Sequence, residues 1–368
     1  MTEDDLPEAD RADGAPHPRH TPRVFGQHVA EHSVLTALGR GRRHHAWLLT
    51  GPRGVGKASF AWRLARYLRT EEENGPGLFG DPDPITTLDV SSEHPVARQM
   101  SALADPGTLL IRRAWDPDRK RLKAQITVEE VRKLNSFFGL SATDGGSRVV
   151  IVDSADEMNP SAANALLKVL EEPPAKAVLL LISHQPARLL PTIRSRCRML
   201  RFAPLGQEDM AAALTQADVE VSDAARLTEL AGGSAGEALR LITGNGLAIY
   251  QDVIGLFAGA PNMDRQSARR FADAAAARGA EARLDLSLRL LDLALVRLAR
   301  TATGHPPALD AAPEERDILN RLGTVPARRW AELQQTLSQR LGHGMAVNVD
   351  PSSLIVDALL QINETARG

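Results

Sequence analysis

The stretch "GPRGVGKAS", residues 51–59, decides the fold that we expect for this chain. Gly51, Gly54, Gly56 and Lys57 follow the G-x-x-x-x-G-K spacing of a phosphate-binding loop. The loop comes after the apolar run "WLLT" and before the helical pattern "ASFAWRLARYLR". A glycine-rich turn in this position directs backbone N–H groups, and the positive end of the next helix, at phosphates. The stretch therefore predicts a nucleotide-binding α/β domain.

The residues that would hold magnesium and activate water are incomplete around this loop. Ala58 stands where such loops carry a hydroxyl for the metal, and Ser59 lies one position further, about 100° around the helix. Asp153 ends the apolar run "VVIVD" and suits the acidic ligand of a neighbouring strand, but Ser154 replaces the glutamate expected after it. We predict a site that can bind ATP or ADP without hydrolysing it and whose magnesium ligands are incomplete: Gly51, Gly54, Gly56, Lys57, Ala58, Ser59 and Asp153.

Short apolar runs in the first half of the chain predict a parallel sheet with helices on both faces. Strands buried on both faces are continuously apolar rather than alternating. The runs cover 45–50, 108–113, 148–153, 177–183 and 198–202. Asn159 can cap the helix that follows the third run, with Pro160 in its first turn.

Composition divides the chain into regions. Residues 1–20 are acidic and contain prolines, so we expect a disordered tail. Residues 21–203 hold the α/β domain, with 71–107 as a surface insertion. Residues 204–244 predict a small lid of three helices, and 245–368 a helical collar.

A leucine pattern in the expected collar leaves two interpretations open. Leu284, Leu288, Leu291, Leu295 and Leu298 recur every three or four residues, and further leucines widen the stripe. A helix that is apolar over so much of its circumference packs against neighbours on more than one side. The stripe suits either the core of a monomeric bundle or an oligomerisation surface.

The overall composition excludes several classes of protein. The 44 Lys and Arg residues nearly balance the 46 Asp and Glu residues, so the whole chain is not drawn to nucleic acid or to membranes by charge. No apolar run reaches the roughly 18 residues of a membrane helix, and the acidic N-terminus is unlike a signal peptide. A single cysteine, Cys197, cannot form an internal disulfide or a four-cysteine metal site. We expect a cytoplasmic protein with no membrane contact and no bound zinc.

Several motifs together resemble the delta prime group of the bacterial DNA polymerase III clamp-loader family, which consists of AAA+ proteins. The resemblance covers about 24–244 and rests on "GQHVAEHSVLTAL", "HHAWLLTGPRGVGK", "ITVEEVRKL", "VVIVDSADEMNPSAANALLKVLEEPP" and "LLPTIRSRCRML". It implies a P-loop AAA+ domain, a helical lid and a collar. It also implies gamma/tau and delta subunits as partners in a five-membered ring, which loads the sliding clamp on primed DNA.

The resemblance implies a role in trans for Arg196, in "SRC". In the family, this arginine reaches the ATP that an adjacent gamma or tau subunit holds. A guanidinium from another chain stabilises charge on a transferring phosphoryl group and makes hydrolysis depend on assembly. An internal salt bridge is the alternative for Arg196, and Arg194 could share the role.

The chain departs from the active members of the family. Gly236 stands where active members offer a lid arginine, and the zinc knuckle of many relatives is missing. We therefore expect a non-hydrolytic subunit of the polymerase III holoenzyme, with an active gamma/tau-like ATPase as the alternative. Residues 112–123 carry six Lys or Arg around Trp115 and suit either primer-template DNA or a solvated hairpin.

Overall fold

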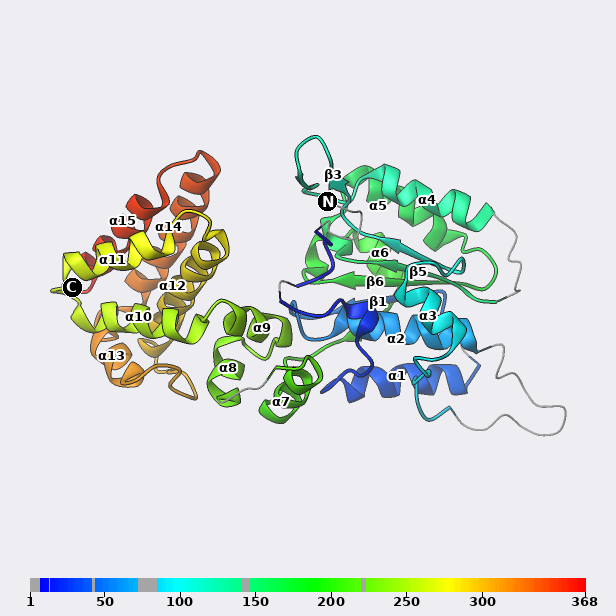
Figure 1. Ribbon diagram of the computed structural model, residues 1–368, viewed down its shortest axis with the longest axis horizontal. Coiled ribbons are helices and arrows are strands. Elements are labelled where there is room, and N and C mark those ends of the chain that lie inside the picture. The colour runs from blue at the N-terminus through cyan, green and yellow to red at the C-terminus, as the bar shows by residue number, and fades with distance from the viewer. Residues whose placement is uncertain (1–6, 13, 42–43, 72–84, 140–145, 220–222) are drawn as a thin grey trace. The chain divides into compact units, whose positions relative to one another are not determined.

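The computed structural model of the chain describes residues 7–12, 14–41, 44–71, 85–139, 146–219 and 223–368. It divides into two compact units (Figure 1). The first holds Met1–Val221 with Gly233–Glu237, and the second holds Ser222–Gly232 with Ala238–Gly368. This division cuts through the region expected to be the lid, so the predicted boundaries of a three-domain chain stay predictions.

The first unit is built, within the described residues, on a five-stranded parallel sheet of order β2-β5-β6-β1-β7. Each of the predicted apolar runs forms one of these strands. They are β1 (Ala46–Thr50), β2 (Thr108–Ile111), β5 (Arg148–Val152), β6 (Ala177–Ser183) and β7 (Arg198–Arg201). The predicted parallel α/β sheet with helices on both faces is confirmed.

Helices cover both faces of this sheet, because successive residues of a strand point to opposite faces. In Figure 1, α1 (His28–Gly39) and α2 (Lys57–Thr70) lie below the sheet. On the opposite face lie α4 (Val128–Gly139), α5 (Pro160–Glu171) and α6 (Pro191–Arg196). Two separate apolar cores result, one on each face of the sheet.

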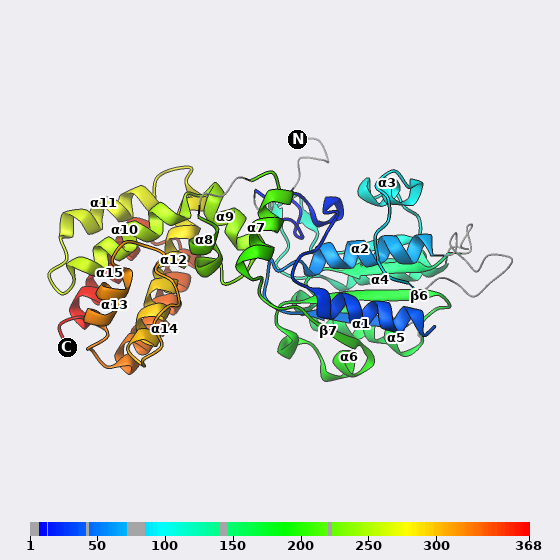
Figure 2. The ribbon, with the colours of Figure 1, turned by 90° about the horizontal axis from the view of Figure 1, so that it is seen from below.

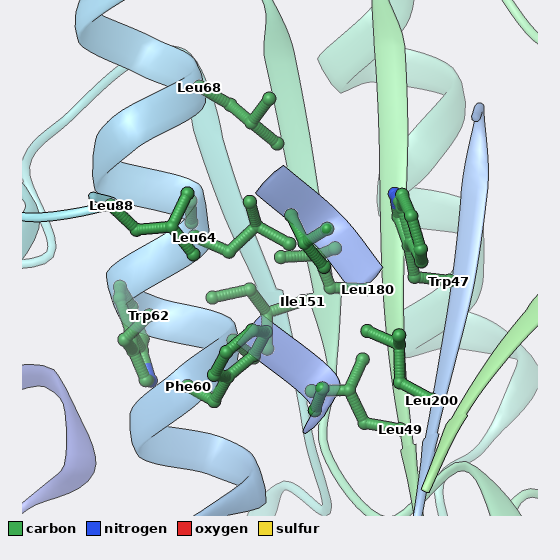
Figure 3. Close-up of a cluster of buried hydrophobic side chains, with 14 of the residues drawn as sticks. Trp47, Leu49, Phe60, Trp62, Leu64, Leu68, Leu88, Ile151, Leu180 and Leu200 are labelled. Atoms are coloured by element: carbon green, nitrogen blue, oxygen red, sulfur yellow. The ribbon is translucent and has the colours of Figure 1, made fainter. Parts of the chain in front are cut away.

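Large apolar side chains fill the core between α2 and the sheet (Figure 3). Phe60 and Leu64 of α2 pack with Leu49 of β1 and Leu180 of β6, and all four are fully buried. Burying a side chain of this size contributes about 1.5–3 kcal/mol. This packing holds the end of β1 and the start of α2 in place, and with them the loop that joins the two.

The N-terminal segment differs from the disordered tail that its composition suggested. Residues 7–12 and 14–20 pack on the first unit, and the rest of 1–20 lies outside the described residues. His17 is 2% exposed, with its ring 6.3 Å from that of Trp62. Arg66 of α2 donates a hydrogen bond at 2.9 Å to a backbone carbonyl of the segment. Specific contacts to α2 therefore hold a segment whose average composition is polar.

The described part of the expected surface insertion also packs on the domain. Residues 85–107 contain the short helix α3 (Pro95–Ser101), and Met100 is buried in the α2 core. Arg69 of α2 donates to both carboxylate oxygens of Asp105, at 3.0 and 3.1 Å. Apolar anchors and a buried ion pair dock this part of the insertion on the domain. Residues 72–84 lie outside the described part.

The remaining described elements are helices and one small hairpin. The hairpin joins β3 (Trp115–Asp116) to β4 (Arg121–Leu122), and short 3₁₀ turns cover Pro18–His20, Ala155–Glu157 and Pro186–Arg188. The three helices expected between 204 and 244 are α7 (Gln207–Gln216), α8 (Ala224–Leu230) and α9 (Ala235–Thr243). The rest of the second unit is helical, as predicted: α10 (Gly246–Gly259), α11 (Arg265–Ala275), α12 (Glu281–Thr301), α13 (Glu315–Leu322), α14 (Ala327–Ala346) and α15 (Pro351–Thr365) (Figure 2).

Among the described residues, no single helix has both the length and the apolar composition needed to cross a membrane. The pair α9 and α10 meets this test only when the two helices are taken together, and it is bent by 80°.

A buried polar network joins the helices of the second unit. Glu315 of α13 is fully buried and accepts hydrogen bonds from Arg297 at 2.8 Å and from the Tyr250 hydroxyl at 2.6 Å. Its second oxygen accepts from the backbone N–H of Ala311 at 2.7 Å. Burial, together with the charge of Glu315, raises the pKa of Tyr250 well above its usual value. Glu315 is the shared acceptor of this network, while Arg297 also pairs with Glu229 at 3.1 Å.

We predict that Glu315→Ala destabilises the second unit by about 3 kcal/mol, because it removes the buried carboxylate that Arg297 and the Tyr250 hydroxyl share and leaves Arg297 only the partly exposed Glu229 as an ionic partner. Urea unfolding followed by the fluorescence of Trp330, which is fully buried in this unit, measures the change. Glu332→Ala is the matched control, because it removes a carboxylate from an exposed pair on α14 and should change little. Equal changes in the free energy of unfolding in the two variants would contradict the role assigned to the network.

Candidate functional site

The loop between β1 and α2 has the backbone conformation that a phosphate cradle requires. Gly51 has φ +146°, and a Cβ atom there would lie 2.4 Å from the carbonyl oxygen of Phe202. Gly54 has φ +72°, and a Cβ atom there would lie 2.2 Å from Ser234 Oγ. Any other residue at these positions would meet both backbone strain and a clash. The predicted glycines therefore do form a tight loop at the end of β1.

Lys57 is turned onto this loop. Its side chain is almost completely buried, and Nζ donates to the carbonyl oxygens of Gly51, at 2.7 Å, and of Pro52. Burial lowers the pKa of Lys57 to about 8, against the opposing effect of Asp153 and Asp156. A phosphate group entering the cradle would take the place of these carbonyl partners.

The first turn of α2 does not supply a metal ligand of the usual kind. Gly56, with φ +98°, precedes the helix, and the Ala58 methyl group packs against the apolar core. Ser59 is half-buried one position further along α2. The hydroxyl that would face magnesium is thus replaced by a methyl group.

Asp153 lies at the end of β5, where its backbone N–H donates to the carbonyl of Ile111 at 2.9 Å. Burial raises the pKa of its carboxyl group to about 7, and the charges of Asp10 and Glu157 add to the shift. Near neutral pH this carboxyl group is therefore partly protonated, whereas magnesium binds the carboxylate. Together with Ala58, this donor set does not fit a magnesium ion held by two protein side chains.

Ser154, which replaces the expected glutamate, faces a histidine. Its backbone has φ +57°, and its Oγ lies 3.2 Å from His184 Nε2. Burial lowers the pKa of His184 to about 3, and the charges of Lys57 and Arg53 contribute. A group with so low a pKa is a poor general base at neutral pH.

The next two acidic residues are already engaged. Asp156 accepts a hydrogen bond from the backbone N–H of His184 at 2.9 Å. Glu157 is paired with Arg53 of the loop and with Arg113, whose Nε lies 2.8 Å from Glu157 Oε2. A carboxylate whose oxygens are engaged by two guanidinium groups has little remaining capacity to accept a hydrogen bond from water. Neither residue is placed to activate water.

Ser183 ends β6 at the same edge of the sheet. It is fully buried, and its Oγ has no hydrogen-bond partner among the described residues. A buried hydroxyl without a partner is costly, so this group is available to a ligand at the edge.

The first turn of α9 contacts the cradle. The backbone N–H of Gly236 donates to the carbonyl of Gly54 at 3.1 Å. A Cβ atom on Gly236 would lie 3.1 Å from Gly54 Cα. The arginine that active relatives are expected to carry here would require this contact to open.

Arg196, the residue expected to act in trans, is the last residue of α6. Its Nη2 lies 2.9 Å from Glu171 Oε1, and its Nη1 donates to the carbonyl of Thr192 at 3.1 Å. Its guanidinium is 36% exposed and the Glu171 carboxylate 49%, so the pair contributes only about 0–1 kcal/mol. Arg196 therefore makes the internal salt bridge that the sequence left as an alternative, and it can leave that bridge at little cost.

Arg194 and Cys197 lie close to Arg196 in the sequence and have different surroundings. Arg194 is exposed on the same helix. Burial raises the pKa of the Cys197 thiol to about 12, so the thiol is protonated and unreactive at neutral pH.

The basic run 112–123 is divided between the site and the hairpin. Arg112 pairs with Glu8 and Asp10, and Arg113 pairs with Glu157. Lys120 and Arg121 are exposed on the hairpin β3–β4. The predicted contact with primer-template DNA stays a prediction.

Sequence reasoning missed the arginines and the histidine that surround the acidic residues. Arg53 lies inside the loop, Arg113 follows β2, and His184 follows β6. Because ligands of parallel sheets bind at the carboxyl ends of the strands, residues that directly follow the strands were a usable signal. The two acids of the N-terminal segment gave no such signal, since they precede every strand.

Comparison with known proteins finds relatives among the subunits of DNA polymerase III. Residues 26–206 match the family described as "DNA polymerase III, delta subunit". DNA polymerase III subunit delta' of Pseudomonas aeruginosa is 37% identical over 207 residues, which cover 55% of this chain and 57% of the relative. The same subunit of Escherichia coli is 33% identical over 214 residues, covering 58% of each chain. Subunit gamma/tau of Mycobacterium tuberculosis is 32% identical over 205 residues, covering 55% of this chain and 32% of the relative. The match to the two delta' relatives thus spans less than two thirds of their length.

The raised pKa of Asp153 predicts how the stability of the chain depends on pH. An acid whose pKa is higher in the folded state than in the unfolded state stabilises the fold at low pH, and this contribution is lost as pH rises to about 7. Asp153→Asn has no such loss, so its stability relative to the unmodified chain should increase by about 2–3 kcal/mol between pH 5 and pH 8.

Urea unfolding at the two pH values measures this difference. Asp118→Asn, in the exposed turn of the hairpin, is the control that makes the same chemical change outside the site. A difference between Asp153→Asn and the unmodified chain that stays constant with pH would contradict the buried, proton-binding state of Asp153.

Proposed function

Residues 26–206 of this chain belong to the DNA polymerase III delta-subunit family, and on that premise we propose that the chain is a delta-prime-like subunit of a clamp loader. Its partners are then gamma/tau and delta subunits in a five-membered ring in the cytoplasm. In this assembly it is a largely non-hydrolytic scaffold that helps to load the sliding clamp on primed DNA.

The state of Glu157 carries the non-hydrolytic part of the proposal. A P-loop ATPase needs a free carboxylate or an equivalent group to position the attacking water. The nearest candidate is held by Arg53 and Arg113, and Ser154 occupies the position of the usual glutamate. The chain can therefore offer a cradle for phosphates while lacking a group to activate water.

An active gamma/tau-like ATPase is the alternative, and the similarity to gamma/tau subunits over about half of the chain favours it. That function requires a metal ligand on α2, a free base and a lid arginine. Ala58, Ser154 and Gly236 stand at these three positions. The alternative therefore needs several groups that this site does not offer.

The proposal includes nucleotide binding, but with an incomplete set of magnesium ligands from the protein. The P-loop fold makes nucleotide binding possible, and Lys57 is placed to reach phosphates once it leaves the loop carbonyls. We propose ATP or ADP as the ligand, with magnesium held mainly by the phosphates. We propose no zinc.

Arg196 supplies the second part of the function. Its exposed pair with Glu171 can be exchanged for a phosphate group of ATP in a neighbouring subunit. A guanidinium supplied in trans makes hydrolysis by the neighbour depend on correct assembly. The chain would thus act on an ATP molecule that it does not itself bind.

We predict that Arg196→Ala leaves the assembly of the clamp-loader complex intact and lowers ATP hydrolysis at the adjacent gamma/tau site by about 10³-fold or more. The measurement is ATPase turnover of the reconstituted complex, with one active gamma/tau site next to this chain. Complex mass is measured in parallel.

Two matched variants accompany this experiment. Glu171→Ala removes the internal partner of Arg196 and should preserve turnover, while Arg194→Ala tests the neighbouring arginine. Unchanged turnover in an assembled Arg196→Ala complex would leave Arg196 with a structural role only.

A further inference from the structure

The acidic N-terminal segment lies against the edge of the sheet that carries the nucleotide site. Arg112 directly follows β2, and Ile111 pairs with Val152 in the sheet, which places Arg112 beside Asp153. Arg112 Nη1 lies 3.1 Å from Glu8 Oε1 and also contacts the carboxylate of Asp10. Arg112 therefore brings two acidic side chains of the N-terminal segment to the carboxyl end of β2.

These acidic side chains are built into the domain. The Asp10 side chain is 1% exposed, and Arg19 Nη1 lies 2.7 Å from Glu8 Oε1. His17 Nε2 lies 3.0 Å from Asp10 Oδ2. Such burial with guanidinium partners is unlike a solvated acidic tail, whose charges would remain in water.

The tautomer of His17 argues against a metal at this cluster. His17 Nδ1 accepts a hydrogen bond from the backbone N–H of Arg19 at 3.0 Å, so the proton of the neutral ring sits on Nε2. That N–H faces Asp10 and cannot ligate a metal ion. Glu8, Asp10 and His17 therefore lie close enough to share an ion, but they serve to hold the segment in place.

A second contact extends the segment across the phosphate cradle. The Cβ atom of Ala12 lies 3.8 Å from the position of a Cβ atom on Gly236, whose N–H is bonded to Gly54 of the loop. The segment thus runs from the carboxyl ends of β2 and β5 to the contact between the cradle and the first turn of α9. In Figures 1 and 2 the dark blue N-terminal segment lies beside this end of the sheet.

The position of the segment creates an electrostatic conflict with nucleotide. The charge of Asp10 already contributes to the raised pKa of Asp153. The phosphates of a nucleotide bound at Lys57 would add several negative charges to the site around Asp153, on which the charge of Asp10 already acts, and like charges in a poorly solvated site repel strongly.

We propose that residues 8–12 are an intramolecular ligand of the phosphate end of the nucleotide site, and that they must leave before a nucleoside diphosphate or triphosphate binds. Arg112 holds them in the site through its ion pairs with Glu8 and Asp10. Residues 17–21 are the fixed anchor, because His17 packs on Trp62 and Arg66 of α2 binds the carbonyl oxygens of residues 19 and 21. The inference concerns binding in this chain alone, so it does not depend on the role of Arg196.

The test compares nucleotide affinity with and without the segment. Fluorescently labelled ADP and ATP are titrated into the full chain, into a chain that lacks residues 1–12, and into the full-length double variant Glu8→Gln/Asp10→Asn. If the segment occupies the site in nine of ten molecules, its removal should lower the apparent Kd about tenfold. The double variant should shift in the same direction. Glu93→Gln, an exposed acid distant in sequence, is the control and should leave the Kd unchanged.

A reciprocal measurement uses trypsin. Arg11 is an exposed cleavage site within the segment, so saturating ADP should speed cleavage after Arg11 if nucleotide displaces the segment. This arm uses the full chain and remains decisive if the shortened chain does not fold.

Affinities of the shortened chain and the double variant within about twofold of the full chain, or no nucleotide binding by any form, would overturn the inference. The inference would also be overturned if saturating ADP slowed the cleavage by trypsin after Arg11 or left its rate unchanged. A shortened chain that binds nucleotide tightly without hydrolysing it supports the inference and leaves the proposed function intact. A shortened chain that also hydrolyses ATP supports the inference and contradicts the non-hydrolytic function.

Discussion

The burial of Lys57 and Asp153 at one edge of the sheet is the constraint on which the site depends. Burial shifts the pKa of Lys57 down to about 8 and that of Asp153 up to about 7, so near neutral pH Lys57 stays mostly charged while Asp153 is partly protonated. Lys57 compensates by donating to the carbonyls of its own loop. A phosphate would stabilise the charge on Lys57, whereas Ala58 offers magnesium no hydroxyl on α2. The same edge can therefore hold a nucleotide without assembling a metal-dependent hydrolytic site.

Solvent exposure distinguishes the charged groups that act within this chain from Arg196, which can act on a neighbouring subunit. The Glu157 side chain is 16% exposed and pairs with Arg113, which is 26% exposed, beside the nucleotide site. Such groups are held by the fold, and rearranging them would expose unpaired charges. Arg196 is different, since it shares a solvent-exposed pair with a single carboxylate. The internal salt bridge of Arg196 and its role in trans are therefore compatible. The salt bridge is weak enough to break when Arg196 contacts ATP in a neighbouring subunit.

The sequence predicted the sheet well because its signals are local and repeated. Each strand is a continuous apolar run, and Asn159 caps α5 as expected, with Oδ1 accepting from the N–H of Ala162 at 2.8 Å. The sequence did not predict the specific contacts that dock two polar segments on the domain. Residues 85–107 and the N-terminal segment are polar overall, but the Arg69–Asp105 pair docks the first, and contacts with His17 and Arg112 dock the second. Each of these pairs joins residues whose proximity depends on the finished fold.

The central claim is that the chain keeps a phosphate cradle but lacks the groups that hydrolyse a nucleotide. Steady-state release of phosphate by the purified chain alone, at saturating ATP and magnesium, tests this claim most directly. The account predicts a rate indistinguishable from that of the Lys57→Ala variant, because neither protein has a free base or a complete set of metal ligands. Sustained hydrolysis by the unmodified chain that disappears in Lys57→Ala would contradict the account.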